Sequence, residues 1–284
     1  MIFYSGPFAI AGWGNGTLAT LWLAVMVVVF FLVKSWKQRA VWWGAFLLMV
    51  LVPYFSIQPS DEREWSPEFS RVGYASVSED HVTLHYTRVF NYRTETDFDA
   101  RWESRAYTLS KLQGVDYIQS NFHGDLMAHP LLSFDFGDEG RICLSVESRR
   151  EQGEEFSPFG GLYKIYELQY IFSTEEDIVF LRSHIRKETV RRYTLNAKPS
   201  QIREVFLASV KAQNALAETP KFYNVLRTNC TTSLRVLQPK EQRIPWDLRL
   251  LFNGRLDSYL YEENFILTEG LPFEELREKA LVLP

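Results

Sequence analysis

Two long apolar stretches near the N-terminus constrain the fold of this 284-residue chain more than any other feature. Residues 1–33 contain no charged side chain, and the run over residues 17–33 is almost entirely apolar. A second uncharged apolar run covers residues 41–57, and the first acidic residue is Asp61. A helix needs about 20 apolar residues, within a range of about 17–25, to cross the hydrocarbon core of a bilayer. The sequence therefore predicts a two-span transmembrane hairpin within residues 1–60.

The charges beside the two spans predict their orientation. The connecting loop carries Lys34, Lys37 and Arg39, whereas residues 61–64 after the second span are net negative. Because positively charged loops stay in the cytoplasm, we expect this loop inside and both termini outside. A cleaved signal peptide is the alternative, but it requires a basic segment before the apolar run, and nothing before residue 17 is charged. Aromatic residues that favour the membrane interface lie near the span ends: Trp13, Trp36, Trp42, Trp43 and Tyr54.

Residues 61–284 have the composition of one polar domain. Three of the 31 Lys and Arg lie in the loop between the spans, so 28 remain against 35 Asp and Glu, a formal charge of −7. This balance provides no basic face and therefore excludes a nucleic-acid partner. The length suits a single domain, and the polar residues 58–75, with two prolines, predict a linker from the membrane to that domain.

The order of predicted elements indicates an α+β fold. Alternating patterns predict strands at residues 81–93, 101–109, 130–136, 141–149, 162–172 and 189–195, with a turn at 137–140. Helical patterns cover residues 174–185, residues 199–218, and a segment that opens at Asn229 or Cys230 and ends at Leu237. Residues 110–122 are ambiguous. Strands come first and helices later, which favours the α+β class over alternating α/β.

The two cysteines, Cys143 and Cys230, differ in their setting. Cys230 follows Arg-Thr-Asn at a predicted helix N-terminus, where unpaired N–H groups and the helix dipole favour a thiolate and can hold an oxyanion. That setting predicts a nucleophile. Cys143 lies between two aliphatic residues within a strand, which indicates a small buried hydrophobe. Because the domain is expected in an oxidising compartment, a disulfide between the two cysteines stays open as the alternative.

A thiol nucleophile needs a base, and the chain offers five histidines. His81 and His85 lie in an alternating strand, which indicates structural roles, and His184 lies among basic residues on a helix. His123 precedes Gly-Asp and fits a turn. His129 opens a strand, where a side chain can reach across to a neighbouring helix terminus. We therefore expect His129 to act as the base.

A third group should orient the imidazole of such a pair. Glu147 lies on the same face of the strand 141–149 as the cysteine of that strand, because side chains alternate with period two. It is the expected partner, although an ion pair with Arg149 or Arg150 would also explain this residue. Asp135 shares the face of His129 on its own strand and stays open as the alternative.

Three segments carry a resemblance to a known family. The run AHPLLSFDFGDEGRICLSVESRREQGEEFSPFGGLYKIYELQYIFSTEEDIVFLR, the later FYNVLRTNCTT and the upstream VFNYRTETDFDARWESRAYTLSKLQGVDYI resemble the periplasmic domain of Lnb-type lipoprotein N-acyltransferases. The resemblance covers roughly residues 85–235. The order of a His-bearing strand, a Glu-bearing strand and a late Asn-Cys also resembles circularly permuted papain-like folds, such as the NlpC/P60 and lecithin–retinol acyltransferase groups.

The resemblance implies roles for individual residues. It implies that Cys230 is the nucleophile and His129 its base, with Glu147 as the third member. Oxyanion or positioning roles are implied for Asn229, Thr231, Tyr223, Asn224 and Arg149. It implies no metal and no cofactor.

The expected function is acyl transfer at the bacterial inner (cytoplasmic) membrane, with residues 61–284 forming a periplasmic catalytic domain. Cys230 would take an acyl chain from a membrane lipid, or from the lipoprotein's own diacylglyceryl group, and pass it to the N-terminal amine of a diacylated lipoprotein. A periplasmic cysteine peptidase or amidase, and a non-catalytic interaction module with a disulfide, are the alternatives. An apolar groove beside Cys230 favours acyl transfer, and a polar cleft favours hydrolysis. We also expect the spans to pack against the domain as part of that groove.

Overall fold

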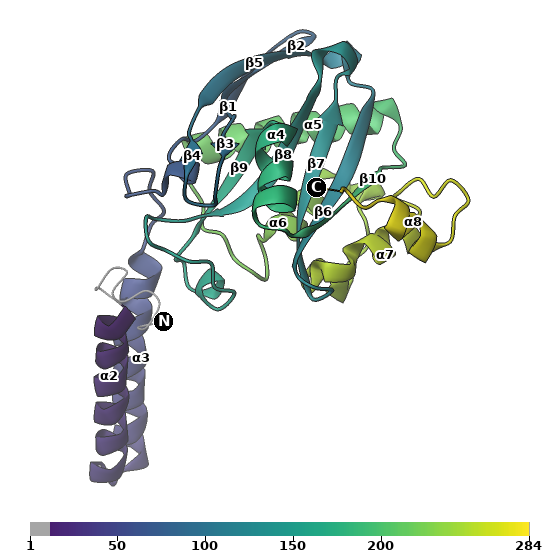
Figure 1. Cartoon of the computed structure of the whole chain (residues 1–284). Coiled ribbons are helices and arrows are strands. Elements are labelled where there is room, and N and C mark those ends of the chain that lie inside the picture. The colour runs from purple at the N-terminus through teal and green to yellow at the C-terminus, as the bar shows by residue number, and fades with distance from the viewer. Residues whose placement is uncertain (1–11, 284) are drawn as a thin grey trace.

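The computed structural model describes residues 12–283 and consists of a helical hairpin attached to one mixed domain (Figure 1). The hairpin helices α2 (Gly12–Leu32) and α3 (Trp36–Ser56) lie side by side, and Trp22 packs edge to face on Phe46. Both helices are long and apolar enough to cross a membrane. Each extends beyond the predicted apolar run and includes an interfacial tryptophan, Trp13 or Trp36.

An eight-stranded sheet forms the centre of the domain. Its order is β1-β2-β9-β8-β7-β6-β10, with β5 paired to β2, and β6 to β9 form antiparallel ladders. The strands are β1 (Tyr74–Ser78), β2 (His81–Arg88), β5 (Trp102–Thr108), β6 (Gly114–His123), β7 (Met127–Asp135), β8 (Arg141–Arg149), β9 (Glu167–Ser173) and β10 (Thr189–Thr194). A separate two-stranded ribbon pairs β3 (Asn91–Tyr92) with β4 (Phe98–Asp99).

Helices cover both faces of the sheet, which confirms the α+β class. The main core lies under α5 (Pro199–Glu218) and α6 (Cys230–Leu237), where Phe134 and Phe206 are fully buried. A second core lies under α4 (Glu175–Phe180) and the π-helical turn η5 (Leu181–Ile185) on the other face. The C-terminal helices α7 (Leu256–Glu262) and α8 (Phe273–Lys279) lie near β6 and β10 (Figure 1). Short 3-10 turns are η1 (Pro67–Phe69), η2 (Leu109–Lys111), η3 (Gly137–Glu139), η4 (Gly160–Leu162), η6 (Lys240–Gln242), η7 (Leu248–Leu250) and η8 (Asn253–Arg255).

The predicted elements are present, but β1 was not predicted, β7 starts at Met127 rather than at residue 130, and other elements differ in their bounds. The first strand ends at Arg88, and its register is broken at a bulge where Tyr86 has a φ of +56°. The strand predicted from residue 162 starts only at Glu167, because η4 and a positive φ at Lys164 precede it. The ambiguous segment is strand β6, and the helix predicted at 174–185 continues as a π-turn after its first six residues.

The predicted linker is bound to the domain rather than loose. The backbone N–H of Ser60 donates to Glu167 Oε1 at 2.7 Å, and Asp61 accepts from Arg149 Nη1 at 2.6 Å. The Arg149 guanidinium also stacks 4.0 Å from the Trp65 ring centroid. Lys164 Nζ, in the loop before β9, donates to backbone carbonyl oxygens at the end of α3.

These contacts place the hairpin at a particular end of the sheet. Because neighbouring strands are antiparallel, the end of β6, the start of β7, the end of β8 and the start of β9 lie at the same end. The linker binds Arg149 and Glu167, which are the last residue of β8 and the first residue of β9. We call this the membrane end of the sheet, and it also contains His129 and Glu147.

Candidate active site

Cys230 is the first residue of α6, and the turn before it is tightly fixed. The side chain of Asn229 accepts from the Thr232 backbone N–H at 2.8 Å, and Thr232 Oγ1 accepts from the Asn229 backbone N–H at 3.0 Å. This capping box satisfies N–H groups that a helix start leaves unpaired. Asn224 closes the preceding turn by accepting from two backbone N–H groups. The predicted helix start at Asn229 or Cys230 is therefore confirmed, and it holds the thiol in a defined position.

His129 and Glu147 lie where strands β7 and β8 part. The ladder between these strands ends at the pair Leu131–Ser145, although both strands continue toward the membrane end. His129 Nε2 lies 3.2 Å from Glu147 Oε1 and 2.8 Å from Ser145 Oγ. Ser145 Oγ in turn donates to Glu147 Oε1 at 2.5 Å. Because both contacts use Nε2, the other ring nitrogen, Nδ1, is left for the thiol.

Arg182 completes the surroundings of the carboxylate. It comes from the π-turn η5, and its Nη2 lies 3.4 Å from Glu147 Oε1. Its Nη1 lies 3.2 Å from Glu188, which also accepts a hydrogen bond from Ser120. The side chains of Arg182, Glu188 and Glu147 are 6%, 8% and 14% exposed, so the charges are paired within the protein rather than by water. π-turns of this kind occur often at functional sites.

The surroundings favour a charged imidazole and a charged carboxylate. Burial and the nearby Arg182 both act to lower the pKa of His129, but Glu147 and the hydrogen bonds to Cys230 and Glu147 raise it above its usual value. Burial acts to raise the pKa of Glu147, but His129, Arg182 and Ser145 hold it well below the usual range. An imidazolium stabilised in this way can balance a thiolate at Cys230.

Two further side chains reach the thiol. The Tyr223 hydroxyl interacts with the Cys230 backbone, and its pKa is raised well above the usual value, chiefly by burial and by the negative charges of Cys230 and Glu147. Tyr223 therefore keeps its proton and can donate it in a hydrogen bond. Asn253 Nδ2 donates to Thr231 Oγ1 at 2.7 Å and lies 3.9 Å from Cys230 Sγ. Asn253 Oδ1 accepts from the Ala128 backbone N–H at 2.8 Å, which ties η8 to the start of β7.

The structure brings most of the predicted site residues together and separates others. Cys230, its neighbours Asn229 and Thr231, His129, Glu147 and Tyr223 form one cluster. Asp135 lies at the opposite end of β7 and binds Arg141 at 2.8 Å, so Glu147 is the carboxylate beside the imidazole. Arg149 binds the linker, and Asn224 shapes the turn before the helix.

The two cysteines are both free thiols. Cys143 is fully buried in the core under α4, whereas Cys230 packs against the core under α5 and α6. They thus occupy opposite faces of the sheet, which argues against the disulfide alternative. Burial raises the pKa of the Cys143 thiol, as expected for an inert core cysteine.

Sequence reasoning missed three members of the cluster. Ser145 shares the face of Glu147 by period two, so the alternation could have identified it. Arg182 depends on a π-turn, which has no recognised sequence pattern. Asn253 comes from a 3-10 turn that reaches the site only through the tertiary fold.

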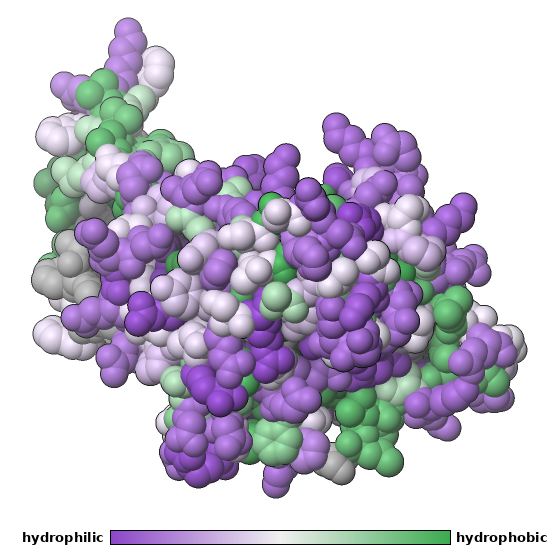
Figure 2. Space-filling view, turned by 90° about the horizontal axis from the view of Figure 1, so that it is seen from above, coloured by the Kyte–Doolittle hydropathy of each residue, from purple (hydrophilic) through white to green (hydrophobic). Residues whose placement is uncertain are grey.

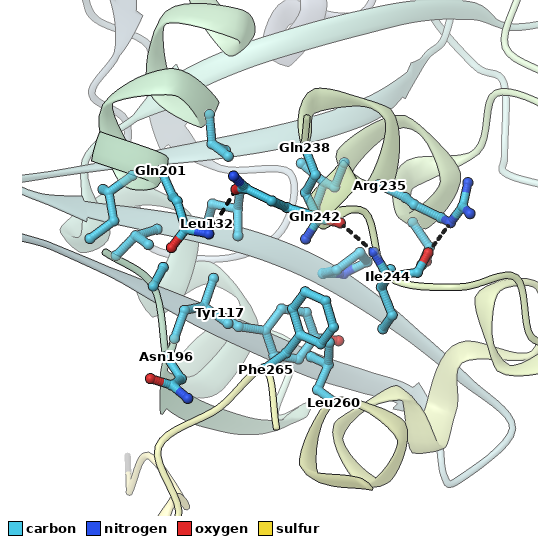
Figure 3. Close-up of a pocket in the computed structure, with 18 of the residues that line it drawn as sticks. Tyr117, Leu132, Asn196, Gln201, Arg235, Gln238, Gln242, Ile244, Leu260 and Phe265 are labelled. Atoms are coloured by element: carbon cyan, nitrogen blue, oxygen red, sulfur yellow. Dashed lines mark hydrogen bonds between the residues drawn. The ribbon is translucent and has the colours of Figure 1, made fainter. Parts of the chain in front are cut away.

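An apolar pocket adjoins the cluster on the α6 side (Figure 3). It lies between β6, β7, α5, α6 and the C-terminal segment, and its cavity volume is about 120 Å³. Pro130 and Thr231, the neighbours of His129 and Cys230 in the chain, line it. Tyr117, Phe265 and Leu260 lie together along one side, and Gln201 is hydrogen-bonded to Gln242 across from them (Figure 3). Its lining is mostly apolar, which favours an apolar ligand.

The fold and this cluster define a membrane-anchored α+β protein with a cysteine, a histidine and a carboxylate at the membrane end of its domain. The family model of the Lnb N-terminal periplasmic domain matches residues 98–254, more than half of the chain. The chain belongs to this family, and residues 98–254 are a periplasmic domain. The match contains every member of the cluster, from His129 to Asn253. No curated protein and no solved structure matches the chain.

Proposed function

We propose that this protein is a cysteine-dependent lipoprotein N-acyltransferase of the bacterial inner membrane, with its site on the periplasmic side. The observation that carries the proposal is the apolar pocket. Its lining includes Pro130 and Thr231, which follow His129 and Cys230 in the chain. A peptidase or amidase would place a polar cleft for a peptide beside its thiol. Membership of the Lnb family supports lipoprotein processing as the setting.

The first half of the reaction forms a thioester. His129 Nδ1 accepts the proton of Cys230 Sγ, and the thiolate attacks the carbonyl carbon of an acyl ester. The C–O bond breaks, the imidazolium returns its proton to the departing alkoxide, and the acyl chain stays on sulfur. The donor is a phospholipid or the diacylglyceryl group of the lipoprotein itself, and its chain lies in the apolar pocket.

The second half transfers the chain to nitrogen. The α-amine of the lipoprotein's N-terminal cysteine attacks the thioester, the C–S bond breaks, and an amide forms. His129 takes the proton that the amine loses, which regenerates the pair with the Cys230 thiolate. A phospholipid donor gives a triacylated lipoprotein, and an internal donor gives a lyso form. No metal or cofactor enters either step.

The oxyanion of each tetrahedral intermediate needs donors aimed at it. The backbone N–H of Cys230, which the sequence suggested for this role, is next to the Tyr223 hydroxyl oxygen. We therefore assign the Tyr223 O–H and Asn253 Nδ2 as donors. Ser145 and Arg182 hold Glu147, and Glu147 holds the imidazole. The order of these elements along the chain supports a circularly permuted papain-like arrangement.

The test is mass spectrometry of intact lipoproteins from membranes that contain the full-length protein. A Cys230→Ala variant should leave lipoproteins without the added N-acyl chain. A Cys143→Ala variant is the matched control and should retain the activity, because Cys143 is buried in the opposite core. N-acylation by Cys230→Ala would refute the mechanism. Release of free fatty acid without N-acylation by the native protein would indicate hydrolysis instead.

A further inference from the structure

Large apolar side chains are exposed on loops and at a strand end at the membrane end of the domain. The exposed fractions are 68% for Phe159, 56% for Leu226, 40% for Phe122, 58% for Leu126 and 60% for Phe252. An isolated exposed hydrophobe is ordinary on a protein surface. These five, which we call the apolar tips, come from four segments that are separate in sequence and meet at the same end of the sheet.

The apolar tips flank the start of α6 on two sides. On one side, the Val225 backbone N–H donates to Gly161 O at 3.1 Å, which joins the turn of Leu226 to the loop of Phe159. On the other side, the Gly254 N–H donates to Leu126 O at 3.3 Å, which joins the segment of Phe252 to the β6–β7 turn. Asn253, next to Phe252 in the chain, lies 3.9 Å from Cys230 Sγ. The carbonyl oxygen of Val225, next to Leu226, accepts from Asn229, the residue before Cys230.

The loop of Phe159 is fixed to the point where the chain leaves the membrane. Lys164 Nζ donates to the carbonyl oxygens of Tyr54 and Ile57 at 3.1 Å each, and the Tyr54 hydroxyl donates to Leu162 O at 3.4 Å. The bilayer surface around α3 must therefore pass close to this loop. The face of the domain turned away from the hairpin is mostly hydrophilic (Figure 2).

The charges among the apolar tips are compatible with a lipid surface. Asp125, in the β6–β7 turn, is neutralised by Arg277 at 2.6 Å and lies 3.7 Å from Arg255. Arg227, beside Leu226, is exposed and has no ion-pair partner within residues 12–283. The Arg227 guanidinium is therefore available to contact anionic lipid headgroups.

We propose that the apolar tips insert into the bilayer that surrounds the hairpin, so that the domain docks on the outer surface of its own membrane on both sides of the start of α6. The ligand of this surface is the lipid itself. The inference stands apart from the proposed function, because it concerns where the domain rests and not which reaction occurs there.

The test measures lipid contact directly in the full chain. Single cysteines replace Phe159, Phe252 or Val77 in a Cys230→Ser background and carry an environment-sensitive fluorophore; the native Cys143 is fully buried and does not react. Val77 is the matched control, since it is 51% exposed and lies near the β1–β2 turn. In that turn, the Asp80 carbonyl oxygen accepts from the Leu109 backbone N–H. Leu109 lies shortly before the start of β6, so the turn is at the end of the sheet opposite the membrane end. The proteins are placed in phosphatidylethanolamine–phosphatidylglycerol vesicles with or without spin-labelled lipid.

Docking predicts that the labels at 159 and 252 lose most of their emission to the spin-labelled lipid, while the label at 77 keeps its emission. If neither tip label is quenched, the proposal is wrong. Quenching at 159 alone is also contrary to it, because that loop is tied to α3 and would contact lipid without docking of the domain. Equal quenching at all three positions would indicate nonspecific adsorption and would likewise overturn it.

Discussion

Replacement of Glu147 by Gln removes one charge from the candidate site and keeps the shape of the side chain. In the native protein, Glu147 Oε1 lies 3.2 Å from His129 Nε2 and 3.4 Å from Arg182 Nη2. Burial and Arg182 act to lower the pKa of His129, and the carboxylate is the main group that raises it. Without the carboxylate, Arg182 faces the imidazolium unscreened. The pKa of His129 should therefore fall, and a thiolate formed at Cys230 would lack its counter-ion.

The distance sets the size of the effect. Two unit charges 3.2 Å apart attract by about 5 kcal/mol at an effective dielectric constant of about 20. Gln keeps hydrogen bonds to Ser145 and so recovers part of this energy. Since about 1.4 kcal/mol corresponds to tenfold in rate, loss of half or all of the attraction predicts a decrease of roughly 10²- to 10⁴-fold. Positioned acid–base groups contribute a similar factor.

Alkylation of Cys230 by iodoacetamide measures this effect without knowledge of the acyl donor. Cys143 is fully buried, so Cys230 is the reactive thiol. The Glu147→Gln variant should react slowly near neutral pH and recover only at higher pH. Asp135→Asn is the matched control, because Asp135 binds Arg141 at the other end of β7 and should not matter. A Glu147→Gln protein with the native pH profile would refute the reasoning.

Three further tests concern Asn253, the apolar pocket and the stability of the protein at low pH. Asn253→Ala should slow alkylation and lower the free energy of unfolding by about 1–3 kcal/mol, because the buried Ala128 N–H loses its acceptor; unchanged urea denaturation would contradict this. Ala197→Trp should fill the apolar pocket and shorten the transferred acyl chain in lipoprotein mass spectra, and Thr194→Trp, outside the pocket, should not. Because the pKa of Glu147 is lowered in the folded protein, its carboxylate stabilises the folded state at pH values above the usual pKa of a glutamate. This stabilisation is lost as the pH falls through the pKa that Glu147 has in the folded protein. The melting temperature should therefore fall on acidification, and this fall should be smaller in the Glu147→Gln variant.

Local patterns were sufficient for the parts of the molecule that depend on neighbouring residues. An uncharged run predicts a membrane helix because the bilayer excludes charge over a fixed thickness. Asn229 and Cys230 predict a helix start because a side-chain acceptor there satisfies the first N–H groups. These features need no knowledge of the tertiary fold, and the structure contains a helix in each place.

The sequence alone could not decide which carboxylate, Glu147 or Asp135, lies beside the imidazole of His129. Glu147 and Asp135 both lie on the correct face of their strands, and alternation cannot show which end of the sheet receives α6. The parting of β7 and β8 after Leu131–Ser145 decides it, and that parting depends on which strand pairs continue across the sheet. The π-turn that delivers Arg182 and the 3-10 turn that delivers Asn253 are likewise placed by the completed fold.

Arg149 joins the sheet of the domain to the linker that comes from the membrane. The sequence placed it near the reaction, but its guanidinium binds Asp61 of the linker, stacks on the Trp65 ring and donates to Phe69 O. It lies two residues after Glu147 on the same strand, so the strand that carries the carboxylate also holds the chain that leaves the membrane. In the proposed function, the lipid donor and the lipidated acceptor are both confined to the bilayer, so they would reach a site held at this height at high effective concentration. In the proposed function, Arg149 therefore contributes by holding the domain in position at the membrane, and not by binding the substrate.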